Sequence, residues 1–294
     1  MGRQVFEEPR RSMGLQMLVV QMREYARFFG IKQLPEKPAK FFLNIVKETL
    51  AYRRSNNVER KDFMHLLIDL KNNPNPELHS LTDDEIAAQA AFVFFVAGFE
   101  TSSTLLSFCS YELAKHPEIQ EKARNEVKNV LKRFNGELTY DAMLEMKYLD
   151  QVLKESLRKY PPLSMLTRGA TEDYWVKDTK TPLLIPKGCT VVIPVYSIHN
   201  DPSIYPDPEI FDPERFTPEE ENKRHPFAFL PFGEGPRVCI GLRFGMMQAR
   251  IGMAKMLLNF KMSLAARMDE IQFSRSHFII SNEGGFWINL EKIH

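Results

Sequence analysis

The sequence predicts a mainly α-helical protein with small β-sheets, and three observations support this fold class. Apolar residues recur at helical spacing through most of residues 1–160. Eleven of the 19 prolines fall in residues 182–236, among short β-branched runs that are typical of short strands and a rigid meander. A further helix and a glycine turn follow. We therefore expect one domain over residues 1–294, with a helical part to about 160, a β and meander part over about 161–240, and a final helix and hairpin over about 241–294.

A first amphipathic helix is expected through residues 41–50, after a break that Pro35 and Pro38 predict. Thr82 and Glu85 form a capping box that starts a second helix. No helix breaker follows until Pro117, so this helix could continue for about 33 residues and reach on the order of 50 Å. Later elements are expected at Pro117–Arg133 (helix), Tyr148–Tyr160 (helix), Thr190–Ile193 (strand), from near Ile240 (helix) and at Phe273–Leu290 (hairpin).

Composition and charge exclude several classes of protein. The net charge of +1 gives no global electrostatic reason to bind nucleic acid. Hydrophobic residues at 44% and aromatic residues at 11% can fill a large core, which excludes intrinsic disorder. Three cysteines are too few for a disulfide scaffold. The N-terminus has no apolar leader, and the longest apolar stretch, residues 86–99, is shorter than the roughly 20 residues of a membrane span.

The most specific feature is the segment 232–241 (FGEGPRVCIG), in which a glycine-rich turn leads to one cysteine. Cys239 lies where the last helix is expected to start, and the helix dipole there favours a thiolate. One thiolate cannot hold zinc, which takes four ligands, but it suffices for haem iron because the porphyrin supplies four nitrogens. Arg237 suits a haem carboxylate. An isolated cysteine would more readily be a buried structural one, and the FxxGxRxCxG spacing reverses that preference.

Residues 97–102 (AGFETS) lie in the middle of the expected long helix. Thr101 can donate a hydrogen bond back to the carbonyl of Ala97 and bend the helix, and Gly98 leaves room for a flat cofactor. Glu100 and Thr101 place a carboxylate and a hydroxyl side by side, which suits proton delivery. In the alternative, Thr101 only packs and Glu100 pairs with an arginine. These residues alone favour neither interpretation.

Two further motifs are weak in isolation. Glu155 and Arg158 lie three residues apart on one helix face, and most such pairs are exposed and contribute little to stability. Residues 211–216 (FDPERF), which include Arg215, are typical of an ordinary proline-rich turn.

Together and in this order, the motifs AGxETS, ExxR, PERF and FxxGxRxCxG resemble those of the cytochrome P450 family. The surrounding stretches AGFETSS, EMKYLDQVLKESLRKYPP and PFGEGPRVCIGLRFG are similar to insect microsomal P450s that oxidise xenobiotics. The resemblance covers nearly the whole chain and implies the P450 fold. It also implies N-terminal truncation, because the chain opens at what resembles the middle of a P450 and lacks the membrane anchor and early helices of full-length members.

The resemblance implies roles for the motif residues. Cys239 would be the axial thiolate ligand of haem iron, with Phe232 packed beside it. Arg237 and Arg168 would pair with haem propionates. Glu100 and Thr101 would be a proton-delivering pair. Ala97 and Gly98 would form the haem face of the long helix. Glu155, Arg158 and Arg215 would form a structural ion-pair network.

The implied activity is that of a haem-thiolate monooxygenase with haem b (iron protoporphyrin IX), which inserts one atom of O2 into a hydrophobic small molecule. Phe94, Phe95 and Phe99 would contribute to an apolar pocket wall. The implied electron donors are NADPH–cytochrome P450 reductase and cytochrome b5. The implied location is the cytosolic face of the endoplasmic reticulum membrane, although this chain shows no anchor. The alternative is a truncated, non-catalytic P450 fragment that binds haem or is haem-free.

Overall fold

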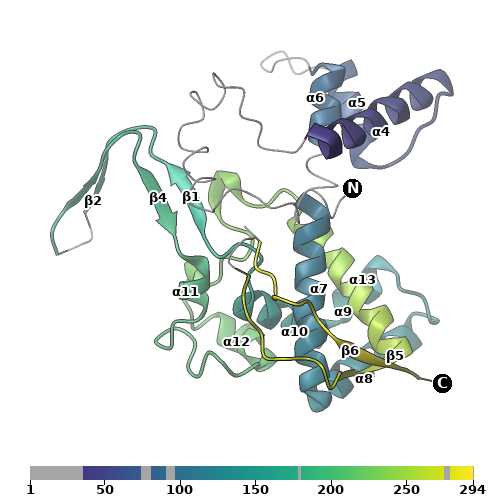
Figure 1. The fold of residues 1–294 in the computed structure, drawn as a ribbon, viewed down its shortest axis with the longest axis vertical. Coiled ribbons are helices and arrows are strands. Elements are labelled where there is room, and N and C mark those ends of the chain that lie inside the picture. Colours follow the sequence, from purple (N-terminus) through teal and green to yellow (C-terminus); the bar gives the residue numbers. More distant parts are fainter. Residues whose placement is uncertain (1–35, 74–80, 91–96, 178–179, 275–278, 294) are drawn as a thin grey trace. The chain divides into compact units, whose positions relative to one another are not determined.

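The computed structural model describes residues 36–73, 81–90, 97–177, 180–274 and 279–293. The chain divides into two compact units, residues 1–101 with 275–278 and residues 102–274 with 279–294, and each is described here by itself. The division into one domain stays a prediction. The described residues are mainly helical with small sheets (Figure 1), so the predicted fold class is confirmed.

The first unit contains three described helices, α4 (Glu36–Ser55), α5 (Phe63–Asn72) and α6 (Asp83–Ala90). The predicted break at Pro38 is wrong. Pro38 lies in the first turn of α4, where a missing N–H removes no hydrogen bond within the helix. The three helices share one apolar core, formed by Phe42, Val46, Leu50, Leu67, Ile86, Ala87 and Ala90.

The predicted capping box is present at the start of α6. The N–H of Thr82 donates to the Glu85 carboxylate over 2.8 Å, and the N–H of Glu85 donates to the Thr82 hydroxyl over 3.2 Å. Residues 91–96 lie outside the described residues. The helix is described again as α7 (Gly98–Lys115), which a π-helical turn at Ala97 precedes. The predicted continuous helix is therefore seen in two parts.

The second unit is built on residues of α7 together with α8 (Pro117–Arg133), α10 (Lys147–Lys159) and α13 (Leu242–Asn259), which share one apolar core. The predicted bounds of α8 and α10 are confirmed to within one residue. The short helix α9 (Tyr140–Glu145) was not predicted. α13 packs closely beside α7 (Figure 1), since a Cβ added at Gly252 would lie 3.4 Å from the Leu106 side chain.

The N-terminus of α10 is held by other helices. α10 has no side-chain cap of its own, and the carboxylate of Glu126 in α8 accepts hydrogen bonds from the N–H groups of Tyr148 (2.7 Å) and Leu149 (2.8 Å). These N–H groups have no partner within the helix, so the contact satisfies them. Asp150, in the first turn of α10, accepts a hydrogen bond from Arg250 of α13. α10 is thus tied to both α8 and α13.

The described strands form antiparallel pairs: β1 (Leu166–Gly169) with β4 (Thr190–Ile193), β2 (Tyr174–Val176) with β3 (Leu183–Ile185), and β5 (Phe260–Leu264) with β6 (Ile288–Lys292). The strand predicted at β4 is confirmed. The hairpin predicted over 273–290 has its glycine turn, since Gly284 and Gly285 adopt φ of 79° and 76°, but Phe273 bridges to Asn282, which precedes that turn. Its strand pairing is wrong. β6 pairs with β5, whose alternating burial points Met262 into the core.

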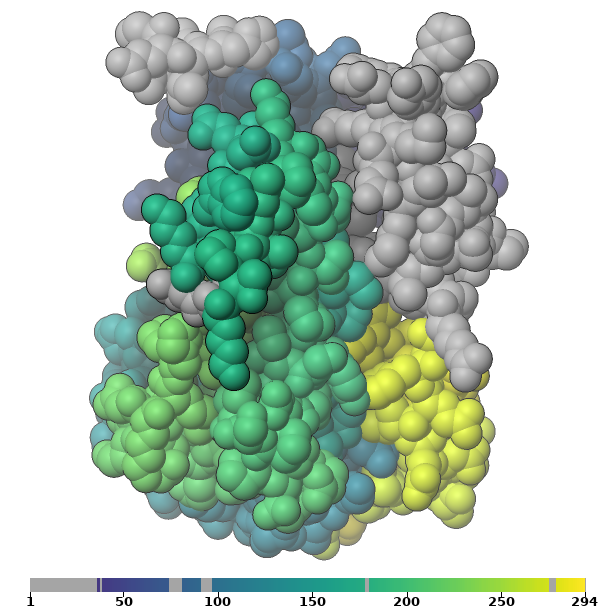
Figure 2. Space-filling view, turned by 90° about the vertical axis from the view of Figure 1, so that its left-hand side faces the viewer, coloured from purple at the N-terminus to yellow at the C-terminus, as the bar shows by residue number. Residues whose placement is uncertain are grey.

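The predicted meander consists mainly of short helical turns, which the sequence did not predict. They are α11 (Val195–His199), η2 (Pro213–Phe216), α12 (Pro218–Glu221), η3 (Pro226–Ala228) and η4 (Gly235–Arg237), where η marks a 3-10 helix. In all but α11, a proline stands in the first turn, where its missing N–H costs no hydrogen bond. Figure 2 shows these green segments on the surface of the second unit. Within the described residues, no helix has both the length and the apolar character needed to cross a bilayer.

Candidate functional site

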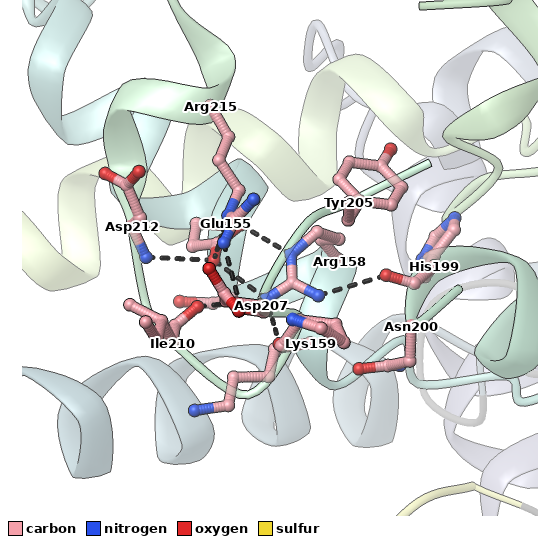
Figure 3. Close-up of polar contacts among 12 residues, drawn as sticks. Glu155, Arg158, Lys159, His199, Asn200, Tyr205, Asp207, Ile210, Asp212 and Arg215 are labelled. Carbon is pink, nitrogen blue, oxygen red and sulfur yellow. Dashed lines mark hydrogen bonds and ion pairs between the residues drawn. The ribbon is translucent and has the colours of Figure 1, made fainter. Parts of the chain in front are cut away.

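A buried ion pair on α10 organises the meander side of the candidate site. Glu155 and Arg158 are both fully buried, and the guanidinium donates to both carboxylate oxygens, with Nε–Oε2 at 2.7 Å and Nη2–Oε1 at 2.9 Å (Figure 3). Burial raises the pKa of Glu155, and the hydrogen bond from Arg158 opposes that shift. The solvated-surface alternative for this pair is therefore excluded.

The Arg158 guanidinium also holds backbone carbonyls of the meander. Nη1 donates to the carbonyl of His199 over 3.0 Å, and Nη2 donates to that of Pro208 over 2.8 Å. Arg158 therefore uses one side chain to join α10, the end of α11 and the segment before η2. A lysine could not make this set of contacts, because its single ammonium lacks the planar fork of donors.

Glu155 contacts the PERF turn directly. One carboxylate oxygen accepts a hydrogen bond from the N–H of Asp212 over 3.0 Å and lies 3.6 Å from Nε of Arg215. Arg215 in turn donates from Nη2 to the carbonyl of Asp207 over 3.0 Å. The fold thus brings together Glu155, Arg158 and Arg215 from two separate motifs (Figure 3).

His199 joins this network, and the sequence analysis missed it. The residue is fully buried at the end of α11, and its ring nitrogen Nε2 accepts a hydrogen bond from the N–H of Leu230 over 2.8 Å. No local spacing could have revealed this contact, because the partners are 31 residues apart.

Cys239 belongs to a tight loop, residues 231–241, which we name the Cys loop. Gly233 and Gly235 adopt φ of 70° and 76°, a left-handed conformation that glycine adopts without strain. The N–H of Cys239 donates to the carbonyl of Phe232 over 2.9 Å, so the loop turns back on itself. The last helix, which was predicted to begin near Ile240, begins two residues later than predicted. Gly241 is the N-cap and α13 begins at Leu242, because a further turn follows the cysteine.

Cys239 is exposed, and so are apolar residues that lie close to it in the sequence. Val238, Ile240 and Phe244 have exposed fractions of 42%, 80% and 53%. Exposed apolar side chains grouped in this way mark a surface that binds a ligand or partner. Within the part of the chain that the structure describes, no group of three or more His, Cys, Asp or Glu side chains could hold a metal ion.

Two arginines lie close to this loop. Arg168 in β1 has its guanidinium beside Gly233, since a Cβ added there would lie 3.8 Å from Nη2 of Arg168 and 3.6 Å from the Leu166 side chain. Arg237, in η4 of the loop itself, is exposed. The fold therefore gathers Phe232, Arg168 and Arg237 on the loop that carries Cys239.

Residues 97–101 of the AGFETS motif belong to the first unit, and Ser102 belongs to the second. The hydroxyl of Thr101 donates to the carbonyl of Ala97 over 2.8 Å, which is the hydrogen bond that the sequence predicts. Ala97 is exposed and Gly98 half-buried, at the π-helical turn. The side chain of Phe99 is 54% exposed, whereas Phe94 and Phe95 lie outside the described residues.

Comparison with known proteins decides the family. The sequence matches the family model described as Cytochrome P450 over residues 14–288. The chain belongs to the cytochrome P450 family. Among curated relatives, this P450 chain is 47% identical to the Drosophila melanogaster protein named "Probable cytochrome P450 6a13", 44% identical to Drosophila melanogaster cytochrome P450 6a9 and 43% identical to Musca domestica cytochrome P450 6A1. These alignments cover 99% or 100% of this chain but 58% or 59% of each relative.

The P450 family implies haem iron as the cofactor. The donor set of the Cys loop fits this group. It offers one exposed thiol for the metal, apolar side chains for a flat macrocycle, and two guanidinium groups for carboxylates.

Proposed function

We propose that this P450 chain is a haem-thiolate monooxygenase that inserts one atom of O2 into hydrophobic small molecules. The Cys loop supports the proposal most directly. It presents Cys239 at the surface, fixes the backbone of that residue through the Phe232 carbonyl, and carries exposed apolar residues on both sides of it in the sequence. Haem b, when bound, supplies the chemistry that activates O2, and the protein needs to provide only one axial ligand.

Four residues of the second unit hold the cofactor in this proposal. Cys239 is the thiolate ligand, and Phe232 covers the side of the loop behind it. Arg168 and Arg237 pair with the two propionates, since a planar guanidinium binds a carboxylate through two parallel hydrogen bonds. The buried network of Glu155, Arg158 and Arg215 keeps the meander, and with it the start of the Cys loop, in one place.

Glu100 and Thr101 move protons in this proposal. The hydrogen bond to the Ala97 carbonyl orients the Thr101 hydroxyl, which can accept a proton from one neighbour and pass its own to another. Gly98 and Ala97 leave the backbone of this turn open to a flat ligand. The exposed ring of Phe99 adds apolar surface, which favours a hydrophobic substrate.

We further propose that electrons come from NADPH–cytochrome P450 reductase, with cytochrome b5 as a second donor, at the cytosolic face of the endoplasmic reticulum membrane. Family membership supports redox partners in general. A reductase titration that follows reduction of the haem-loaded chain by NADPH would test the first donor.

The experiment that tests the function is a carbon monoxide difference spectrum of the reduced, haem-loaded chain. A red-shifted Soret band at the thiolate–haem position is expected for the wild type and for Cys189→Ser, which removes the other exposed thiol. The band should be lost in Cys239→Ser. A band that survives in Cys239→Ser, or no band in the wild type, would refute thiolate ligation by Cys239.

The alternative function is a P450 fragment without turnover. This chain spans 58% of the length of the relative named cytochrome P450 6a13. NADPH-dependent product formation from an apolar test substrate, with purified reductase present, separates the two functions. Product formation excludes the fragment. A thiolate band without product supports a haem-binding fragment, and an absent band supports a haem-free one.

A further inference from the structure

His199 connects the buried network on α10 to the Cys loop. Its carbonyl accepts a hydrogen bond from Arg158 Nη1 over 3.0 Å, and its ring nitrogen Nε2 accepts one from the N–H of Leu230 over 2.8 Å (Figure 3 shows the first). Leu230 is the residue immediately before the Cys loop. One fully buried residue therefore links the position of α10 to the position at which the loop begins.

The contact continues from Leu230 toward Cys239. The carbonyl of Leu230 accepts a hydrogen bond from the N–H of Gly233 over 3.1 Å, and the carbonyl of Phe232 accepts one from the N–H of Cys239 over 2.9 Å. A short series of backbone hydrogen bonds thus connects Leu230 to Cys239. Because buried backbone groups keep their partners, a shift at Leu230 moves the whole series.

The segment before the loop is held at a second point. The Phe229 ring stacks on the His199 imidazole, with centroids 5.3 Å apart and planes at 24°. The Tyr205 hydroxyl donates to the carbonyl of Ala228 over 3.1 Å. The stacking fixes the plane of the His199 ring, and the hydrogen bond from the N–H of Leu230 fixes which ring edge faces that residue.

This arrangement requires a neutral imidazole. Nε2 can accept a hydrogen bond only without a proton, so the ring proton is on Nδ1, a buried atom with no hydrogen-bond partner among the described residues. Burial lowers the pKa of His199 to about 4, and the charge of Arg158 acts in the same direction. The charged and titratable side chains of the surrounding network are Glu155 and Arg158 of α10, Arg215 and Tyr205 of the meander, and Tyr196 of α11.

We propose that His199 is a positioning residue for Cys239. Its neutral ring transfers the fixed position of α10 to the Cys loop and so keeps the thiol where the cofactor needs it. This inference rests on the proposed function for its biological meaning, but one of its readouts does not require haem.

The test compares His199→Phe with His199→Gln in the full chain. Phenylalanine keeps the stacking on Phe229 and leaves the N–H of Leu230 without an acceptor, whereas the glutamine carbonyl can replace Nε2. His225→Phe is the matched control, because Nδ1 of His225 also accepts a backbone N–H, that of Phe227 over 3.1 Å, but in an exposed turn. Hydrogen exchange of residues 228–241 is measured without haem, and the Soret band of the carbon monoxide complex is measured with it.

In His199→Phe, exchange of residues 228–241 should become about tenfold faster, because the N–H of Leu230 is no longer satisfied. The thiolate band should shrink in favour of a blue-shifted band. His199→Gln should restore most of the protection and most of the thiolate band, and His225→Phe should match the wild type. Unchanged exchange in His199→Phe would overturn the inference.

The readouts separate this inference from the proposed function. If the wild type gives no thiolate band, the proposed function fails, but exchange of the haem-free chain still tests His199. If His199→Phe does not fold, His199→Gln decides the matter by its pH dependence. The wild-type protection factors of residues 228–241 should fall between pH 6.5 and pH 4, and those of His199→Gln should not. Identical acid profiles would refute the proposal.

Discussion

Arg250 in α13 donates two hydrogen bonds to the same carboxylate oxygen of Asp150 in α10, one of them from Nε over 3.1 Å. This pair holds the helix that follows the Cys loop, while the network of Glu155 and Arg158 on the same α10 holds the meander that precedes it. Contacts with the same helix, α10, therefore hold the segments on both sides of the Cys loop. The position of Cys239 depends on α10 even though no residue of α10 belongs to the loop.

The Asp150–Arg250 pair should be energetically coupled. Both side chains are about one fifth exposed, with values of 21% and 19%, so solvent screens their attraction only in part. A double-mutant cycle with Asp150→Asn and Arg250→Gln should give a coupling free energy of about 1 kcal/mol in urea unfolding. The same cycle on Arg133 and Glu145, a pair 62% and 42% exposed, should give less than about 0.5 kcal/mol. Equal coupling in the two cycles would contradict this prediction.

Arg158→Lys should destabilise the chain by about 3 kcal/mol, because removing the guanidinium leaves the Glu155 carboxylate and two backbone carbonyls poorly paired in a buried site. Chemical denaturation followed by circular dichroism measures this free energy. Arg133→Lys makes the same change of side chain at an exposed pair and should alter stability by less than about 0.5 kcal/mol. A loss in Arg158→Lys no greater than in this control would show that the buried network does not stabilise the fold.

The sequence predicted the elements and contacts that depend on neighbouring residues. The capping box of Thr82 and Glu85 and the bond from Thr101 to Ala97 each span three or four residues, so helix geometry alone brings the partners together. The apolar stripe of α10 likewise predicted its bounds. Local spacing is sufficient wherever the partners lie on one helix.

Long-range contacts could not be predicted in the same way. The spacing of Glu155 and Arg158 is compatible with an exposed pair, and only packing of the meander over α10 buries it. The partner of His199 is 31 residues away. The pairing of Met262 with Leu290 competes with a nearer hairpin that the glycine turn suggests, and burial of Met262 decides between them. In each case the deciding term is burial, which depends on the whole fold.

The three cysteines should react differently with a maleimide in the native, haem-free chain. Cys189 and Cys239 are exposed and should be modified, whereas Cys109 is fully buried and should react only after unfolding. Burial also raises the pKa of the Cys109 thiol to about 12, which removes the reactive thiolate at neutral pH. Haem should protect Cys239 and leave Cys189 reactive, as peptide mass spectrometry can show. Equal modification of Cys239 with and without haem would contradict its assignment as the ligand.

His199 should make the fold sensitive to acid. Its pKa is lowered from 6.5 to about 4 by burial, so the unfolded chain binds a proton at this residue over a pH range in which the folded chain does not. Stability should therefore fall as the pH falls from 6.5 toward 4, by about 3 kcal/mol from this residue. His199→Gln has no titratable group at this position. All other titratable groups are the same in the two chains, so their contributions cancel when the unfolding free energies are subtracted. The difference in unfolding free energy between wild type and His199→Gln should shrink by this amount over the interval. A difference that is independent of pH would mean that His199 is not buried in its neutral form.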